Sequence, residues 1–223
     1  MLKGSEMRTL KRFLKAAFCS ALDVTPEWIR VIAFPKSAAW YDAFFERSVS
    51  YATLNDCPWR NLYSKVLSMV DPSMQIMDRG CGPGLLAEMA IARGMHYANG
   101  IDFSMEAIHA AEERVPNVSF FVSDLERGPY DDESFLKHKH LSGKPCQVFV
   151  EVLEHLKDDR RVIEWIPPGT RVVGSVPKFW SRGHVRRFKN LDSVYHRYGK
   201  FLTFDMLHTY GDFIVFRAIR RSF

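Results

Sequence analysis

The sequence has few cysteines, and they form no recognisable pair. Cys19, Cys57, Cys81 and Cys146 are widely spaced and contain no C-x-x-C motif. This spacing argues against a zinc ribbon and against a disulfide framework. We therefore expect free thiols in a reducing compartment, and a cytoplasmic protein.

Long apolar segments are also lacking. The uninterrupted apolar runs are far too short to span a bilayer. The N-terminus is basic, but apolar residues recur at helical spacing between its charges, and no continuous apolar segment or small-residue cleavage site follows. We expect neither a signal peptide nor a membrane partner, and the modest net charge of +5 leaves the class of partner open.

Glycine is nearly absent from residues 1–70, where Gly4 is the only one. Within this region Thr25-Pro26-Glu27 has the form of a helix start, with threonine as the N-cap and proline at the first helical position. Residues 41–45 and 59–70 are aromatic-rich and amphipathic, which is typical of helices that pack onto a sheet. The sequence therefore predicts a helical N-terminal cap over residues 1–70.

From Gln75 onwards, short apolar segments alternate with helical ones. Strands are predicted at residues 75–78, 97–102, 119–122, 147–150 and 171–176, and helices at 85–93, 104–114 and 191–198. Such alternation is typical of a parallel sheet with right-handed crossovers. Residues 201–210 and 212–221 flank Gly211, where a hairpin would add one antiparallel strand. We predict an α/β domain over residues 71–223, with a Rossmann-like, mostly parallel seven-stranded sheet and one antiparallel C-terminal strand.

A glycine-rich loop joins the first predicted strand to the following helix. Its sequence is Asp78-Arg79-Gly80-Cys81-Gly82-Pro83-Gly84. The glycines allow a sharp turn and a close approach of a ligand to the backbone. Their spacing is G-x-G-x-G rather than the G-x-G-x-x-G of dinucleotide sites, and an acid precedes them. An acid disfavours phosphate but suits a ligand with an ammonium group and ribose hydroxyls, as in S-adenosylmethionine (SAM).

Two more acids follow the next two predicted strands. Asp102 ends the second strand, where a carboxylate can accept hydrogen bonds from a ribose diol. Asp124 closes the third strand, where it can accept a hydrogen bond from an adenine amino group. The acids therefore extend the predicted nucleoside site along one edge of the sheet.

Over roughly residues 74–221, these motifs and their order resemble the class I SAM-dependent methyltransferase superfamily. The resemblance implies that Asp78 and the loop residues Gly80, Cys81, Gly82 and Gly84 hold the amino acid part of SAM. It also implies that Asp102 binds the ribose, that Phe103 packs on the adenine, and that Asp124 and Leu125 bracket the adenine edge. Arg79 departs from the apolar or small residue usual in the family, and we expect it to place a positive charge near the mouth of the site.

The segment Glu151-Val152-Leu153-Glu154-His155-Leu156 follows the fourth strand, at the ligand-binding edge of such a sheet. If a helix starts here, Glu151, Glu154 and His155 share one face and could coordinate a divalent cation. The segment resembles the ubiquinone-pathway O-methyltransferases and the small-RNA 2′-O-methyltransferases, and that resemblance implies His184 as a fourth ligand. The alternative is that these residues line the cofactor pocket without a metal. Candidates for a general base are His155, His184 and Glu151.

Residues 178–189 combine basic and aromatic side chains after the fifth strand. Phe179, Trp180 and Arg186 could belong to a lid that contacts the substrate, which would suit RNA or a phosphorylated metabolite, or to a solvated loop with aromatic anchors. Tyr51, Trp59 and Tyr63 are expected either to contact the methyl acceptor or to pack in the core. The run Lys137-His138-Lys139-His140 is expected at the surface.

The function predicted from these features is SAM-dependent methyl transfer to an oxygen, or next to a nitrogen, of a small-molecule acceptor. One alternative keeps the chemistry but makes RNA the substrate, because of the basic lid. Another is a protein that binds SAM or its demethylated product without catalysis. A metal is a further possible cofactor, and the oligomeric state stays open.

Overall fold

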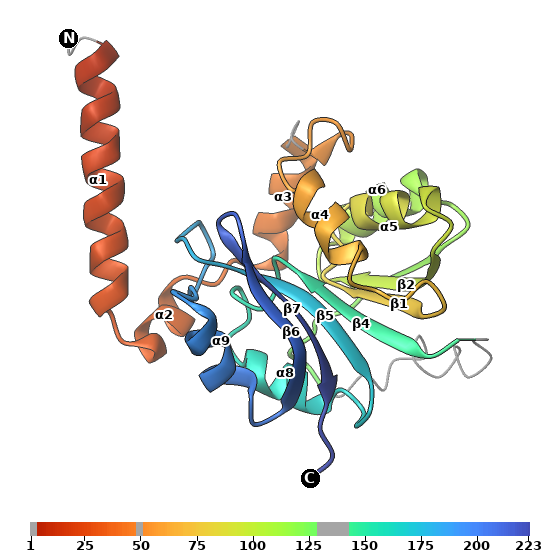
Figure 1. The fold of residues 1–223 in the computed structure, drawn as a ribbon. Coiled ribbons are helices and arrows are strands. Elements are labelled where there is room, and N and C mark those ends of the chain that lie inside the picture. Colours follow the sequence, from red (N-terminus) through yellow and green to blue (C-terminus); the bar gives the residue numbers. More distant parts are fainter. Residues whose placement is uncertain (1–3, 48–50, 129–142) are drawn as a thin grey trace.

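Seven strands form one sheet in the described part of the chain, in the order β3-β2-β1-β4-β5-β7-β6 (Figure 1). This computed structural model describes residues 4–47, 51–128 and 143–223. The strands are β1 (Gln75–Arg79), β2 (His96–Asp102), β3 (Ser119–Val122), β4 (Pro145–Val150), β5 (Arg171–Pro177), β6 (Leu202–Tyr210) and β7 (Phe213–Arg220). β7 is antiparallel to both of its neighbours, β5 and β6, and the other pairs are parallel. The predicted sheet, with one antiparallel C-terminal strand, is confirmed.

The antiparallel strand follows from a tight hairpin. β6 ends at Tyr210 and β7 begins at Phe213, and these two residues pair across the intervening Gly211-Asp212 turn. Gly211 has a φ of +56°. Residues with a Cβ rarely adopt a positive φ, but two-residue hairpin turns require it. The chain therefore reverses direction here instead of crossing over through a helix.

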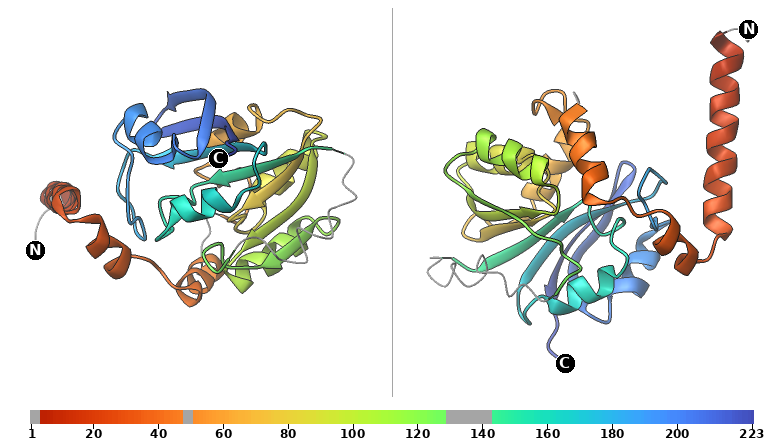
Figure 2. Two further views of the ribbon diagram at one scale, coloured as in Figure 1. Left: turned by 90° about the horizontal axis from the view of Figure 1, so that it is seen from below. Right: turned by 180° about the vertical axis from the view of Figure 1, so that it is seen from behind.

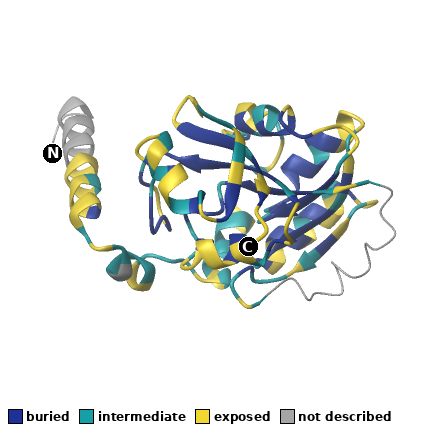
Figure 3. Ribbon diagram, turned by 60° about the horizontal axis from the view of Figure 1, so that its bottom comes forward, coloured by how far each residue is buried: buried dark blue, intermediate teal, exposed yellow. Residues whose placement is uncertain are grey.

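Helices cover both faces of the sheet. They are α1 (Gly4–Val24), α2 (Glu27–Ala33), α3 (Ala38–Arg47), α4 (Arg60–Leu67), α5 (Leu85–Ala92), α6 (Met105–Arg114), α8 (Asp159–Trp165) and α9 (Leu191–Tyr198). One hydrophobic core lies between one face of the sheet and the helices α4, α5 and α6, and it includes Ile76 and Val148. A second core lies between the other face and the helices α8 and α9, and it includes Ile101 and Phe149. The central strands are accordingly buried on both sides (Figure 3).

The N-terminal helices are arranged differently from the rest. α1 projects away from the sheet and its helices in three views, and α2 connects it to them (Figures 1 and 2). The predicted cap at Thr25 is wrong: α2 begins at Glu27 after Pro26, and the Thr25 hydroxyl donates to the carbonyl of Ala21 at the end of α1. None of the helices among the described residues is both long and apolar enough to cross a membrane.

Arg79 does not place its charge near the mouth of a site, contrary to our expectation. Its side chain is buried, and its Nε donates to Oε1 of Gln147 on β4 at 2.5 Å. Because side chains alternate along a strand, Arg79 lies on the same face of β1 as Met77 and opposite to Asp78. The run 137–140, which we expected at the surface, lies outside the described residues.

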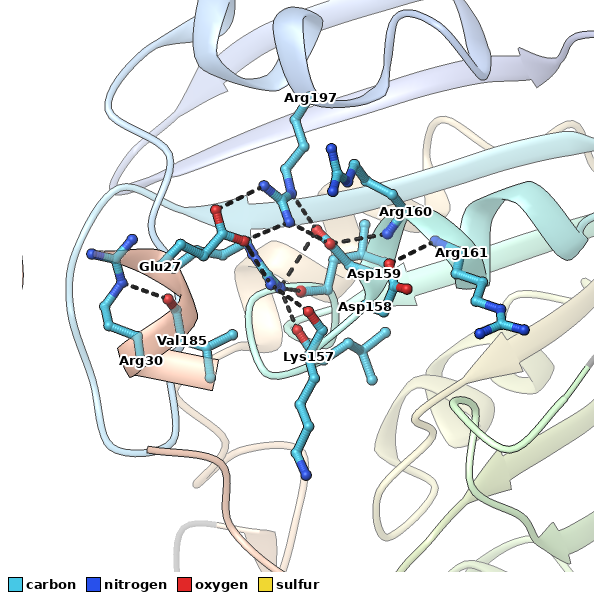
Figure 4. A network of polar contacts seen from close by, with 12 residues as sticks. Glu27, Arg30, Lys157, Asp158, Asp159, Arg160, Arg161, Val185 and Arg197 are labelled. Carbon is cyan, nitrogen blue, oxygen red and sulfur yellow. Dashed lines mark hydrogen bonds and ion pairs between the residues drawn. The ribbon is translucent and has the colours of Figure 1, made fainter. Parts of the chain in front are cut away.

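A network of charges around the buried Asp159 joins α2 to α8 and α9 (Figure 4). Arg197 on α9 lies 2.6 Å from Asp159 on α8 and 2.8 Å from Glu27 on α2. Arg30 on α2 donates to the carbonyl of Val185, in the segment after β5. Three helices and one loop that are distant in sequence therefore meet at a single ionic cluster.

Substitution of a loop glycine can test how closely the glycine loop packs against the segment after β4. Gly80 has a φ of +81°, and a Cβ there would lie 2.4 Å from Cγ2 of Val152. Gly169 has a similar φ of +80°, but a Cβ there would meet nothing within 4 Å. We expect Gly80→Ala to lower the free energy of unfolding by about 2–4 kcal/mol, because it adds steric overlap to the conformational penalty. Urea titration measures this loss.

The matched variant Gly169→Ala carries only the conformational penalty, about 1 kcal/mol. Equal losses for the two variants would show that Val152 moves aside freely and that the loop is not closely packed against the segment after β4.

Candidate functional site

A cavity of about 590 Å³ opens at the carboxyl ends of β1, β2 and β4. Parallel α/β sheets bind their ligands at this edge, where the loops after the strands converge. The volume lies within the range of pockets that enclose small ligands. Its walls come from the glycine loop, from the residues after β2, β3, β4 and β5, and from the N-terminal segment that contains α3 and α4.

The glycine loop forms one wall of this cavity. Gly80, Cys81, Gly82 and Pro83 line it, and the backbone N–H groups of Gly80 and Cys81 donate to the carbonyl of Ile101. These bonds join the loop to the end of β2. Gly84, predicted to touch the cofactor, does not line the cavity. It is the N-cap of α5, with a φ of +77°, and a Cβ there would lie 3.0 Å from that of Ala111 on α6.

Asp102 connects the loop to the cavity. Its Oδ2 accepts from the N–H of Gly82 at 2.9 Å, and its Oδ1 accepts from the N–H of Ser104 at 3.0 Å. Burial raises the pKa of this carboxyl to about 6, against the lowering effect of those two N–H groups. Asp102 lines the cavity together with Phe103, Asp124 and Leu125, so the structure brings these predicted residues together.

Asp78 lies beneath the loop rather than in the cavity wall. It is buried, and its Oδ2 accepts from the Tyr97 hydroxyl at 2.8 Å. Burial raises the pKa of Asp78 to about 7, although the bond from Tyr97 lowers it. We expected its carboxylate to contact a ligand directly. In this structure the carboxyl is bound to Tyr97 on β2 and does not line the cavity.

Helix α3, expected from the sequence only as a helix that packs onto the sheet, forms part of the cavity wall. Trp40, Tyr41, Phe44 and Phe45 on α3 all line it. The Tyr41 ring lies 5.1 Å from that of Phe103, and Asp42 accepts from the Ser104 hydroxyl at 2.6 Å, which fastens α3 to the end of β2. The aromatic density of residues 40–45 was the available signal, but it predicts packing onto a sheet as well as it predicts a cavity wall.

The segment after β4 forms turns and not the helix that we considered for Glu151 to His155. Glu151 has a φ of +58°, the only positive φ outside glycine among the described residues. Such a conformation strains a residue with a Cβ and is most frequent at functional sites. Glu151 lines the cavity, and its Oε1 is buried without a hydrogen-bond partner in the described part of the chain.

Glu154, His155 and His184 form a compact cluster behind Glu151. One ligand atom of each lies within 4.8 Å of the others, and Nε2 of His155 is 3.8 Å from Oε1 of Glu154. The described residues provide no hydrogen bond to either carboxyl oxygen of Glu154. Glu151, which we grouped with these three as a metal ligand, is not part of the cluster.

Burial determines the charge of these three side chains and of the neighbouring Glu151. It lowers the pKa of His155 to about 4 and that of His184 to about 3, so both imidazoles are neutral near pH 7. It raises the pKa of Glu154 to about 8 and that of Glu151 well above its usual value, to which the neighbouring Glu154 charge also contributes. The four side chains therefore carry little charge at neutral pH.

Both imidazoles are held through Nδ1. Tyr41 Oη lies 3.0 Å from Nδ1 of His155, and Nδ1 of His184 lies 3.2 Å both from the N–H of Ser181 and from the carbonyl of Phe179. Contacts of this kind fix the orientation of each ring. His155 and His184 both line the cavity, whereas Glu154 lies behind it.

The segment 178–189 is not the exposed basic lid that we considered. Trp180 is buried, with its Nε1 donating to Asp23 at 3.1 Å, and Arg187 forms an ion pair with the same carboxylate. Arg186 is buried too and donates to the carbonyls of Leu153, Leu156 and Lys157. Trp180 and Arg186 therefore do not fit the substrate-binding role that we expected, because internal contacts use their polar atoms.

The other predicted substrate residues do gather on one part of the cavity wall. Tyr51, Trp59, Tyr63 and Phe179 all line it. Trp59 Nε1 donates to Tyr51 Oη at 2.8 Å, and Trp59 and Phe179 lie nearly parallel. The cavity thus has an end lined by the glycine loop and Asp102, and an aromatic end near Glu151.

Comparison with known families agrees with this architecture. A methyltransferase domain family matches residues 76–160. The demethylmenaquinone methyltransferase of Thermotoga maritima is 26% identical over 162 residues, which cover 68% of this chain and 69% of that protein. The enzyme of the same name from Chlorobaculum tepidum is 32% identical over 91 residues, but these cover only 40% of this chain and 36% of that protein.

Solved structures show the same fold at low sequence identity. An N-methyltransferase from Bradyrhizobium japonicum, in complex with S-adenosyl-L-homocysteine (SAH), has a TM-score of 0.61 at 16% identity and covers 84% of this chain and 100% of its own. A methyltransferase in complex with the Trm112 activator of Haloferax volcanii has a TM-score of 0.64 at 14% identity and covers 84% and 99%. The match over residues 76–160, the strand order and the glycine loop together support the class I SAM-dependent methyltransferase superfamily for this chain.

Proposed function

We propose that this methyltransferase transfers the methyl group of SAM to an oxygen, or to a nitrogen, of a small molecule held in the cavity. One observation carries the proposal. The carboxyl of Glu151 and the neutral imidazole of His155 line the same cavity as Asp102 and the glycine loop. The proposal includes the division into a cap over residues 1–70 and a SAM-binding domain over residues 71–223.

The loop end of the cavity fits SAM. Gly82 leaves the loop backbone open, because a Cβ there would meet only Phe45, at 3.6 Å. Each oxygen of Asp102 accepts one backbone N–H, and a carboxylate oxygen has capacity for another donor, such as a ribose hydroxyl. Phe103 would pack on the adenine, and Asp124 and Leu125 would lie at its edge. When bound, SAM supplies a methyl group that its sulfonium makes electrophilic.

The chain then has to orient the acceptor and remove its proton. His155 is neutral and lines the cavity, so it can accept that proton. Glu154 lies 3.8 Å from its Nε2, and the positive charge of an imidazolium there would favour ionisation of this carboxyl, which in turn would stabilise the imidazolium. Burial and the neighbouring Glu154 raise the pKa of Glu151, which favours its neutral form and a role in orienting the acceptor.

Acceptor chemistry gives the direct test of this function. Incubation with SAM and a panel of phenols, alcohols and amines should release SAH together with a methylated product, both detectable by mass spectrometry. We expect His155→Asn to lower kcat by about a hundredfold or more, since it removes the proton acceptor, while the Kd for SAM stays unchanged. His208→Asn, on β6, is the control and should behave as the wild type.

Tight SAM binding without SAH release from any acceptor would contradict the enzymatic proposal and favour a non-catalytic SAM-binding protein. RNA is a less well supported acceptor, because Arg186 and Arg187 of the basic segment form internal contacts.

The pKa of Asp102 predicts how SAM binding depends on pH. Its pKa of about 6 means that the carboxyl ionises as the pH rises through 6 and becomes protonated below it. Because the ribose hydroxyls need an ionised acceptor, we expect SAM affinity measured by calorimetry to be constant above pH 7. Below pH 6 it should fall by up to about tenfold per pH unit.

Asp102→Asn should bind SAM more weakly at pH 7.5 and should lose most of this pH dependence. Asp124→Asn also changes a residue of the nucleoside site, but it should keep the break near pH 6. A break that persists in Asp102→Asn would show that another group controls binding.

A metal-assisted version of the same reaction is a second candidate, favoured by the cluster of Glu154, His155 and His184. Two imidazoles and the carboxyl of Glu154, once ionised by a bound cation, are ligand types that suit a divalent transition metal. A metal there would lower the pKa of an acceptor hydroxyl. Glu154, His155 and His184 would hold it.

Calorimetric titration with Mg²⁺, Mn²⁺ and Zn²⁺ separates this candidate from the metal-free one. If a metal binds, it should do so with one ion per chain, and His184→Ala should weaken it at least about tenfold, as loss of a ligand predicts. His208→Ala should leave the affinity unchanged. Equal affinities for wild type and His184→Ala would contradict a metal at this cluster.

A further inference from the structure

Helix α1 has an exposed apolar face. Leu14, Phe18 and Val24 are 57%, 52% and 82% exposed, and the exposed Ala17 and Ala21 lie between them in the sequence. Their spacing places all five residues on one side of the helix. Because α1 also projects away from the sheet (Figures 1 and 2), this side is open to solvent. An exposed apolar surface of this kind marks a contact with another molecule or with a membrane.

The rest of the protein holds the end of α1 by a different side. Leu22 is buried, and Asp23 pairs with Arg187 at 2.5 Å and accepts from Nε1 of Trp180 at 3.1 Å. Arg30 on α2 adds a hydrogen bond to the carbonyl of Leu22. With about 3.6 residues per turn, Asp23 lies opposite the middle of the apolar face, and Leu22 lies at its border. These contacts fix the end of the helix and leave its apolar face turned outward.

The sequence of α1 is basic as well as apolar. Four cationic residues recur in it at helical spacing: Arg8, Lys11, Arg12 and Lys15. Its acids are Glu6 and Asp23, and Asp23 is already paired with Arg187. Helices that combine an apolar face with Lys and Arg lie in the interface of anionic membranes. There the apolar side chains enter the boundary of the acyl chains, and the basic ones are attracted to the anionic headgroups.

We infer that α1 is an interfacial helix that binds this protein to an anionic lipid surface, with Leu14 and Phe18 inserted between the lipids and Lys15 at their headgroups. We expected no membrane partner, since the apolar runs are too short to span a bilayer, but a helix that lies in the surface needs no span. A second copy of the chain is a poorer occupant of this face, because it would bring the same four cations to the contact. The lipid contact is independent of the identity of the methyl acceptor.

Vesicle flotation with the full chain tests the lipid surface. Vesicles of phosphatidylcholine alone are compared with vesicles that also contain phosphatidylglycerol, which is anionic. We expect the chain to bind the anionic vesicles at least about tenfold more tightly than the neutral ones. Binding should weaken as the salt concentration rises, because salt screens the attraction between the basic residues and the headgroups.

Two pairs of variants assign the contacts. The double variant Leu14→Gln/Phe18→Gln removes apolar groups without changing the charge, keeps a good helix former at both positions, and should weaken vesicle binding at least about tenfold. Tyr195→Gln is its control, because Tyr195 on α9 is 54% exposed, much as Phe18 is. Lys15→Glu should weaken binding about tenfold, whereas Lys144→Glu, at an exposed residue just before β4, should have little effect.

Several results would overturn the inference. One is the absence of binding to anionic vesicles, or equal binding to both compositions. Equal weakening by the double variant and by Tyr195→Gln would show that lipids contact another surface. Weakening by Lys15→Glu but not by the double variant would show that α1 attracts polyanions such as RNA through charge alone. A dimer in sedimentation velocity that the double variant dissociates, without vesicle binding, would show that a second copy covers the apolar face.

Discussion

The functional edge of this protein depends on one buried guanidinium. Arg186 donates to the carbonyls of Leu153, Leu156 and Lys157, which a helix would have used internally and which the turns after β4 leave without helical partners. The same side chain lies 3.2 Å from Glu27 on α2 and 3.5 Å from Asp159 on α8, so its charge is compensated inside the protein. Loss of Arg186 would leave the three carbonyls without these donors and would leave Arg197 as the remaining basic partner of Glu27 and Asp159, which is more destabilising than losing a surface ion pair. The positions of Glu151, Glu154 and His155 therefore depend on a residue that lies outside the cavity.

The same cluster determines where the cap lies. The Arg197 and Arg186 charges lower the pKa of Glu27 despite the burial that raises it, so this carboxylate stays ionised and paired. The chain that leaves α2 then passes along the cavity and forms α3, which supplies Tyr41 and its aromatic neighbours to the wall. A long-range ionic contact thus places a local aromatic helix. The Tyr41 hydroxyl, 3.0 Å from His155, links the cap to the reactive cluster.

Sequence reasoning predicted those features that local patterns encode. Alternating strands and helices gave the sheet, Gly211 gave the antiparallel hairpin, and the glycine loop with Asp102 and Asp124 gave one end of the cavity. The predictions were wrong for side chains whose positions are set by partners distant in the sequence. Arg186 and Trp180 have the composition of a substrate lid, and only the carboxylates of Glu27 and Asp23, far away in the sequence, make them internal. Arg79 and Gly84 were misplaced for related reasons, because Gln147 pairs with the first and Ala111 packs closely on the second.

The protonation states follow from the same long-range packing, and they limit what the site can do. A helical E-x-x-E-H segment at the surface would carry ionised glutamates and a histidine that titrates near neutrality. Here burial lowers the pKa of His155 and His184 and raises that of both glutamates, which favours the neutral form of each, while Arg186 moderates the effect on Glu154. A neutral cluster exerts little electrostatic repulsion on the cationic sulfonium of SAM, and it leaves an imidazole free to take up a proton as the methyl group transfers. The geometry that Arg186 fixes therefore also fixes the charge, because the turn it holds is what keeps these four side chains out of water.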